Sequence, residues 1–98
     1  MNRPISIHEA AENELNDAAD FYDLESPGLG ETFINEIHKA IDLIAHFPEA
    51  SPLIRGRIRR KVLIKFPYAL IYSLRATEIR ILAVAHEKRR PVYWRGRL

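Results

Sequence analysis

Basic side chains at alternate positions are the feature of this sequence that best suits binding chemistry. Alternate residues of a strand point to the same face of a sheet. Between positions 57 and 65 one side is therefore basic, with Arg57, Arg59, Lys61 and Lys65. The other side is apolar, with Ile58, Val62 and Ile64. The basic side could bind phosphates or the carboxylates of a peptide. The alternative is a solvated edge strand that its charges keep from aggregating.

The apolar segment at 79–85 adds further basic residues to this pattern. By the same alternation Arg80 and His86 lie on one side of that strand, together with Leu82 and Val84. Arg60 falls on the apolar side of the earlier strand and interrupts it. If helices cover the opposite face of the sheet, we expect the basic residues to form one cationic surface.

His86 is also a candidate general acid or base, because histidine titrates near neutrality and this one ends an apolar strand. The alternative is a structural histidine, since no carboxylate motif accompanies it. The other histidines are scattered, and no spacing typical of a metal site joins them. We therefore predict no metal.

The C-terminal segment combines aromatic and basic residues. Tyr93 and Trp94 stand beside Arg89, Arg90 and Arg95. Such a cluster can stack bases and hold phosphate, anchor the tail on the core, or form a protein interface. Packing of the tail is the interpretation we favour for Trp94, and Tyr93 remains open.

Several classes of site are excluded. The absence of cysteine rules out disulfides, thiol nucleophiles and iron–sulfur clusters. The four glycines match no phosphate-binding loop, and the sequence supports neither a Ser-His-Asp grouping nor a paired carboxylate site. We predict no cofactor.

Charge is divided unevenly along the chain. The net charge is +2, but residues 1–50 carry eleven acidic and two basic side chains, whereas residues 51–98 carry two acidic and thirteen basic ones. Such a dipolar molecule could attract an anionic partner to its C-terminal half, either nucleic acid or an acidic peptide.

The length of 98 residues predicts a single domain over residues 1–98. No apolar run reaches the ~18–20 residues of a membrane span, and residues 1–7 do not look like a signal peptide. We expect a cytoplasmic protein that does not contact a membrane.

The elements that must position these residues follow from the apolar spacing. A short strand at 4–7 precedes a helix over 8–25, and a second helix runs to about 47. The second helix is predicted to start with Ser26 as N-cap and Pro27 at its first position. The short connection predicts an antiparallel helical hairpin.

After a loop at 49–56 the period changes to two. We predict three antiparallel strands, at about 57–65, 68–74 and 79–85, with a hairpin turn at 75–78. The last two are nearly continuous apolar runs, which is typical of central strands. The fold class is therefore α+β, with both helices on one face of a largely antiparallel sheet.

The whole pattern resembles the RelE/ParE toxins, the toxin components of bacterial type II toxin–antitoxin modules. The helical hairpin with residues 26–30 and 46–49 is similar to theirs, as is the strand at 66–72. The closing segment at 79–94 carries the most specific likeness, and it looks closer to the ParE branch. One departure is Arg90, which stands where many members carry aspartate.

The resemblance implies one of two activities. ParE-like members poison DNA gyrase, which is our leading hypothesis. RelE-like members are metal-independent ribonucleases that cut mRNA on the ribosome, and here that role could fall to Arg59, Lys61, Arg80, His86 and Tyr93. A third hypothesis is a degenerate toxin that acts only as an antitoxin-binding module. An enzyme is therefore the less favoured interpretation.

The resemblance also implies a cognate, ParD-like antitoxin whose tail wraps the toxin. Operator DNA would then be contacted only through the antitoxin. The residues expected to bind the antitoxin or the target are Arg57, Arg59, Lys61, Lys65, Arg80, Arg89, Arg90 and Trp94.

Overall fold

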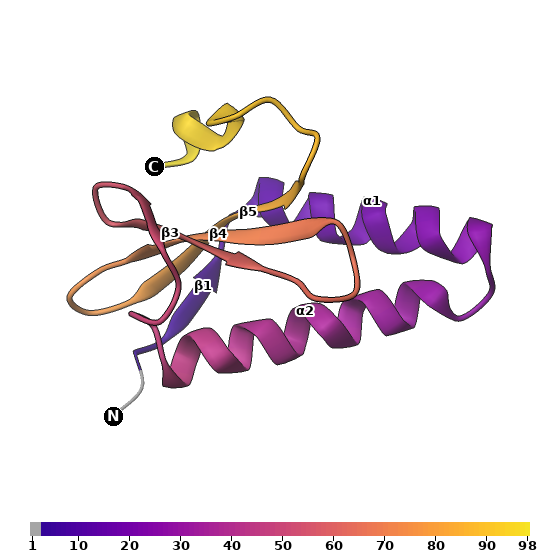
Figure 1. Ribbon diagram of the computed structural model, residues 1–98, viewed down its shortest axis with the longest axis horizontal. Helices are drawn as coiled ribbons and strands as arrows, with labels where there is room; N and C mark the ends of the chain where they lie inside the picture. Colours follow the sequence, from indigo (N-terminus) through magenta and orange to yellow (C-terminus); the bar gives the residue numbers. More distant parts are fainter. Residues whose placement is uncertain (1–2) are drawn as a thin grey trace.

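The computed structural model of the chain describes residues 3–98 and has the predicted α+β architecture (Figure 1). In chain order the elements are β1 (Ile5–Ile7), α1 (Glu9–Glu25), α2 (Leu29–His46), β2 (Leu53–Arg55), β3 (Ile58–Val62), β4 (Tyr68–Leu74), β5 (Ile79–His86) and the 3₁₀ helix η1 (Tyr93–Arg97). Two of these elements were not predicted: β2, which lies inside the predicted loop at 49–56, and η1.

The sheet has five strands in the order β1-β5-β4-β3-β2. β1 runs parallel to β5, and the other neighbours are antiparallel. Both helices cover one face of this sheet, and the segment after β5 crosses the other (Figure 1). None of the helices among residues 3–98 is long and apolar enough to cross a bilayer.

The connection between the helices differs from the prediction. Ser26 ends α1, because its N–H still donates to the carbonyl of Tyr22, and α2 begins only after Gly28. Gly28 has a φ of +88°, which favours glycine. The carboxylate of Asp23 then accepts from the N–H of Gly30 at 2.8 Å, so it caps the first turn of α2. The N-cap role predicted for Ser26 is wrong.

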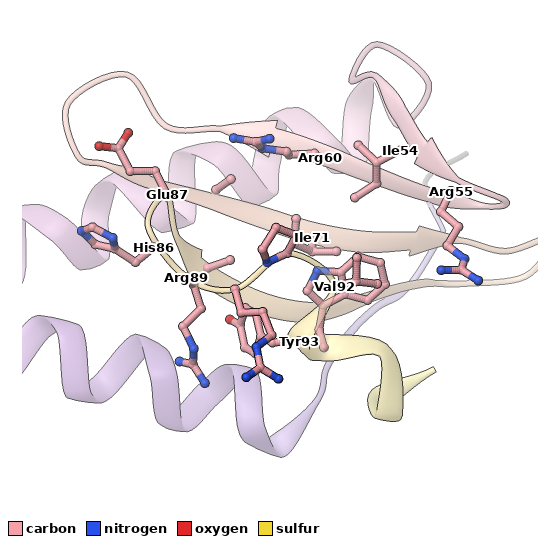
Figure 2. Close-up of a pocket in the computed structure, with 14 residues that line it drawn as sticks. Ile54, Arg55, Arg60, Ile71, His86, Glu87, Arg89, Val92 and Tyr93 are labelled. Carbon is pink, nitrogen blue, oxygen red and sulfur yellow. The ribbon is translucent and has the colours of Figure 1, made fainter.

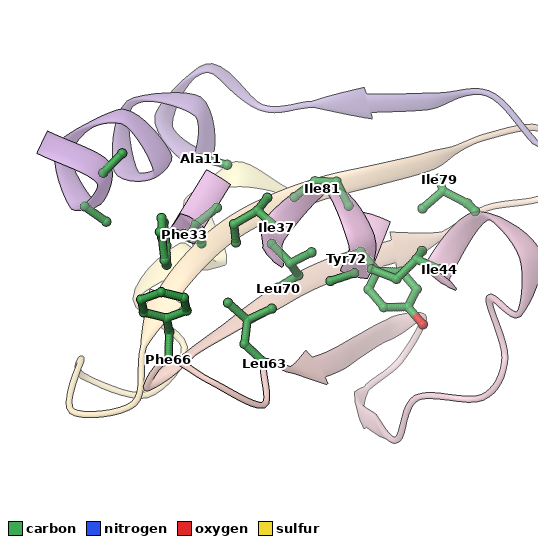
Figure 3. Packing of buried hydrophobic residues seen from close by; sticks show 14 residues of the cluster. Ala11, Phe33, Ile37, Ile44, Leu63, Phe66, Leu70, Tyr72, Ile79 and Ile81 are labelled. Carbon is green, nitrogen blue, oxygen red and sulfur yellow. The ribbon is translucent and has the colours of Figure 1, made fainter. Parts of the chain in front are cut away.

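The main core lies between the helices and the sheet (Figure 3). The largest side chains that are fully buried there include Phe33, Ile37, Leu70 and Tyr72. The hydroxyl of Tyr72 donates to the carbonyl of Pro48 at 2.7 Å, so this buried group is paired.

A second, smaller core lies on the opposite face of the sheet. Its buried members are Ile58, Ile71, Leu82, Ala83 and Trp94, and the segment around Val92 packs against them. The central strands β4 and β5 are therefore covered on both faces, which is why their sequences are nearly continuous apolar runs.

Candidate functional site

A groove of about 380 Å³ lies between the sheet and the C-terminal segment, on the face that the helices leave free. Its lining includes Ala69 and Ile71 of β4 and Ala85 of β5. Pro91, Val92 and Trp94 of the C-terminal segment are also among its lining residues. An apolar surface is therefore accessible here to a binding partner.

Arginines surround this apolar surface (Figure 2). They come from three segments: Arg55 from β2, Arg60 from β3, and Arg89 and Arg90 from the segment after β5. All four side chains belong to exposed residues, and Glu87 is the one acidic residue of the lining. We call this hollow the arginine groove. It is suited to a ligand that combines apolar groups with carboxylates or phosphates.

A second hollow of about 290 Å³ shares Arg60, Ala69 and Glu87 with the arginine groove. It also exposes Val62 and Ile64, whose side chains are 57% and 99% accessible. The two hollows adjoin at these shared residues, and together they could accommodate an extended peptide.

Glu14 of α1 holds the C-terminal segment in place. Its carboxylate accepts from the hydroxyl of Tyr93 at 2.7 Å and from the guanidinium of Arg97 at 2.8 and 3.1 Å. Burial, reinforced by the bond to Glu14, raises the pKa of Tyr93 well above its usual value of 10.0. The same carboxylate raises the pKa of Arg97.

The sequence predicts that the basic residues of β3 lie on the face of the sheet that the helices leave free, but the structure places Arg59 and Lys61 on the other face. Arg59 and Lys61 pair in register with Tyr72 and Leu70, which belong to the core beneath the helices. The expectation of a free cationic face built on these two residues is therefore wrong. It is Arg60, opposite Ile71, that points to the free face.

Other contacts occupy two of the predicted β3 residues. The guanidinium of Arg59 donates to the carbonyls of Glu49 and Ser51, at 3.0 and 2.8 Å. Lys65 lies 3.4 Å from Glu36 of α2, again on the helix side. Arg57 lies in the turn between β2 and β3, outside the groove lining.

A β-bulge changes the phase of β5 between Ile81 and Ala83. Arg80 and Leu82 therefore lie on the free face, whereas Val84 belongs to the core beneath the helices. His86 follows Val84 by two residues, and its ring packs on that of Tyr68 at 5.0 Å. The predicted side shared by Arg80 and His86 does not exist, because alternation fails at a bulge.

The sequence model described as "ParE toxin of type II toxin-antitoxin system, parDE" matches residues 5–91. The chain belongs to the ParE toxin family. A solved structure, titled "Chromosomal ParDE TA system from P. aeruginosa", has a TM-score of 0.76 and 16% sequence identity. The alignment covers 86% of this chain and 95% of that one, and at this identity it concerns the fold. Nothing among curated proteins matches the chain.

This ParE family chain brings only part of the predicted residues together. Arg89, Arg90, Tyr93 and Trp94 line the arginine groove. His86 borders it as well, although its ring packs on that of Tyr68. Arg80 instead donates to the hydroxyl of Ser6 at 3.1 Å. Among residues 3–98 no group of three or more potential ligands could hold a metal ion.

Sequence reasoning missed Arg55 and Arg60 as groove residues. The sequence did contain an indication for Arg60, because this charged residue stands on the otherwise apolar side of its strand. A charge at such a position indicates that the side chain reaches solvent or a binding site. Arg55 gave no such signal, since β2 itself was not predicted.

Proposed function

We propose that this ParE family protein is a growth-inhibiting toxin whose arginine groove binds an acidic, apolar segment of a cognate antitoxin. The observation that carries the proposal is the composition of the groove. An apolar lining around Ile71 is bordered by Arg55, Arg60 and Arg90, none of which forms an ion pair within residues 3–98. A tail that folds on binding supplies both apolar anchors and carboxylates.

We further propose that the target of the free toxin in the cytoplasm is DNA gyrase. Membership of the ParE family supports this choice. The five residues considered for ribosome-dependent RNA cleavage are dispersed: Arg59 and Lys61 lie on the helix side, and the hydroxyl of Tyr93 is engaged by Glu14. Operator DNA would be reached only through the antitoxin.

Two adjacent residues of β3 provide a matched test of antitoxin binding. Arg60→Glu reverses a charge in the groove, whereas Lys61→Glu makes the same change on the opposite side of the strand. By calorimetry with the antitoxin encoded beside the toxin, we expect Arg60→Glu to weaken binding about 30-fold or more, the usual cost of about 2 kcal/mol for a lost interface charge pair. Equal losses in the two variants would contradict the assignment of the groove.

The target is tested with two assays on the purified toxin. We expect inhibited supercoiling and accumulated cleavage complexes with gyrase, and an intact reporter mRNA in a cell-free translation reaction followed by primer extension. Breaks within codons that appear only during translation would instead make the protein a ribonuclease. Toxicity in cells without an effect on gyrase would refute the gyrase proposal.

A further inference from the structure

The outward side of α1 carries a second exposed surface of mixed apolar and acidic character. Asp17, Asp20, Phe21 and Leu24 are spaced i, i+3, i+4 and i+7, so they share one side of the helix. Phe21 is 55% and Leu24 is 88% accessible, which is unusual for large apolar side chains. We call these four residues the outer face of α1.

The outer face of α1 is also sterically accessible. It lies toward the closed end of the helical hairpin, and Figure 1 shows this end of α1 and α2 extending beyond the strands of the sheet. Within residues 3–98 neither Asp17 nor Asp20 takes part in an ion pair. The projecting end therefore offers two carboxylates and two apolar anchors to another molecule.

The arginine groove has the complementary chemistry on the opposite side of the same chain. Its apolar lining could receive Phe21 and Leu24. Arg60 and Arg90, which form no ion pair within the described part of the chain, could meet the carboxylates. The two surfaces cannot meet within one molecule, because α1 covers one face of the sheet and the groove opens on the other. Only a second copy can bring them together.

We propose that the outer face of α1 of one copy docks into the arginine groove of a second copy. The two halves of this interface are different surfaces, so the contact is head-to-tail. Each docked pair leaves one groove and one helix face free, and further copies can add unless the arrangement closes. Residues 1–50 are mainly acidic and residues 51–98 mainly basic. This division of charge favours contact between the N-terminal half of one copy and the C-terminal half of the next, and it disfavours contact between two like halves. An occupied groove is closed to any other ligand.

The test uses two variants that each lack one half of the interface. Asp17→Lys with Asp20→Lys removes the acidic side. Arg60→Gln with Arg90→Gln removes the basic side and leaves no acidic groove that the substituted lysines could bind. Sedimentation velocity of wild-type protein is expected to show masses above that of one chain. Raising sodium chloride from about 0.02 M to about 0.5 M shortens the Debye length from roughly 20 Å to roughly 4 Å. We expect this change to dissociate the oligomers.

Each variant alone is expected to remain monomeric. Their equimolar mixture is expected to form a complex of two chains and nothing larger, because one intact helix face meets one intact groove. Circular dichroism verifies that both variants are folded. A matched control, Glu31→Lys with Asp42→Lys, makes the same charge change at exposed positions of α2 and is expected to associate like wild type.

Three results would overturn the proposal. They are a wild-type protein that is monomeric at low salt across the concentration range, a variant mixture that stays monomeric, and a control variant that loses association as fully as the α1 variant. The last result would mean that net charge drives association. Leu24→Ser tests the apolar anchor at unchanged charge, and we expect about tenfold weaker self-association.

Discussion

The carboxylate of Glu14 and the guanidinium of Arg97 meet through two hydrogen bonds, of 2.8 and 3.1 Å, across a separation of 83 residues. β1 pairs with β5 only as far as Ile81. Beyond that point Glu14 accepts from the N–H of Val84 and Arg97 donates to the carbonyl of Leu82, both at 3.1 Å. The pair thus satisfies the backbone of β5 where β1 ends, and it fixes η1 beside the arginine groove.

Removing the carboxylate of Glu14 should therefore destabilise the whole fold. Glu14→Gln weakens the bonds to Tyr93 and Arg97, whose side chain is only 17% exposed. We expect a loss of about 2–4 kcal/mol in the free energy of unfolding, measured by urea denaturation. Asp17→Asn, at an exposed position of the same helix, is expected to change it by less than about 0.5 kcal/mol. Equal effects would refute the role of Glu14.

Tyr93 should make the protein sensitive to alkali. Burial and the bond to Glu14 raise the pKa of Tyr93 in the folded state above the value of 10.0 that applies on unfolding. The unfolded state therefore releases this proton first as pH rises. The stabilisation is fully present below about pH 10 and is lost progressively above it.

Tyr93→Phe removes the ionising group and isolates this effect. We expect the urea midpoint of wild-type protein to fall more steeply above pH 10 than that of the variant. Difference absorbance at 295 nm follows the tyrosinates directly. Parallel pH profiles of the two proteins would contradict the assignment.

Gly30 is required because the first turn of α2 lies directly against the backbone of α1. A Cβ at this position would collide with the carbonyl oxygen of Ala19 and with the side chain of Asp23. Gly30→Ala should therefore cost about 1–3 kcal/mol, although alanine is the better helix former. Gly96→Ala, where a Cβ meets nothing within 4 Å, serves as the control and should be neutral or slightly stabilising. Thermal denaturation measures both effects, and we expect a lower melting temperature for Gly30→Ala only.

Arg59 is expected to support structure and not activity. Arg59→Met leaves the carbonyls of Glu49 and Ser51 without their present donor, and we expect it to cost about 1–3 kcal/mol in unfolding. Toxicity per folded molecule should be unchanged in growth assays corrected for the soluble amount. If Arg59→Met has the stability of wild type but is no longer toxic, Arg59 acts in function and the prediction is wrong.

Much of the fold was predictable because its signals are local. The helix over 8–25, the end of α2 near residue 47 and the turn at 75–78 follow from spacing and turn chemistry, and all are confirmed. The start of α2 was predicted wrongly because Asp23, seven residues before Gly30, supplies the cap in place of Ser26. β2 was not predicted, because its three residues are all exposed and show no alternation of apolar and polar side chains.

The sequence by itself determined which side chains of β3 share a face, since strand period is a local property. Only the tertiary structure decided which of those faces the helices cover, and it placed Arg60, not Arg59 and Lys61, in the arginine groove. Both faces of this sheet are partly apolar, because η1 and Trp94 bury the second one, so hydrophobicity could not choose between them. The bulge in β5 likewise depends on pairing with β4, and no pattern within one strand encodes its partner's register.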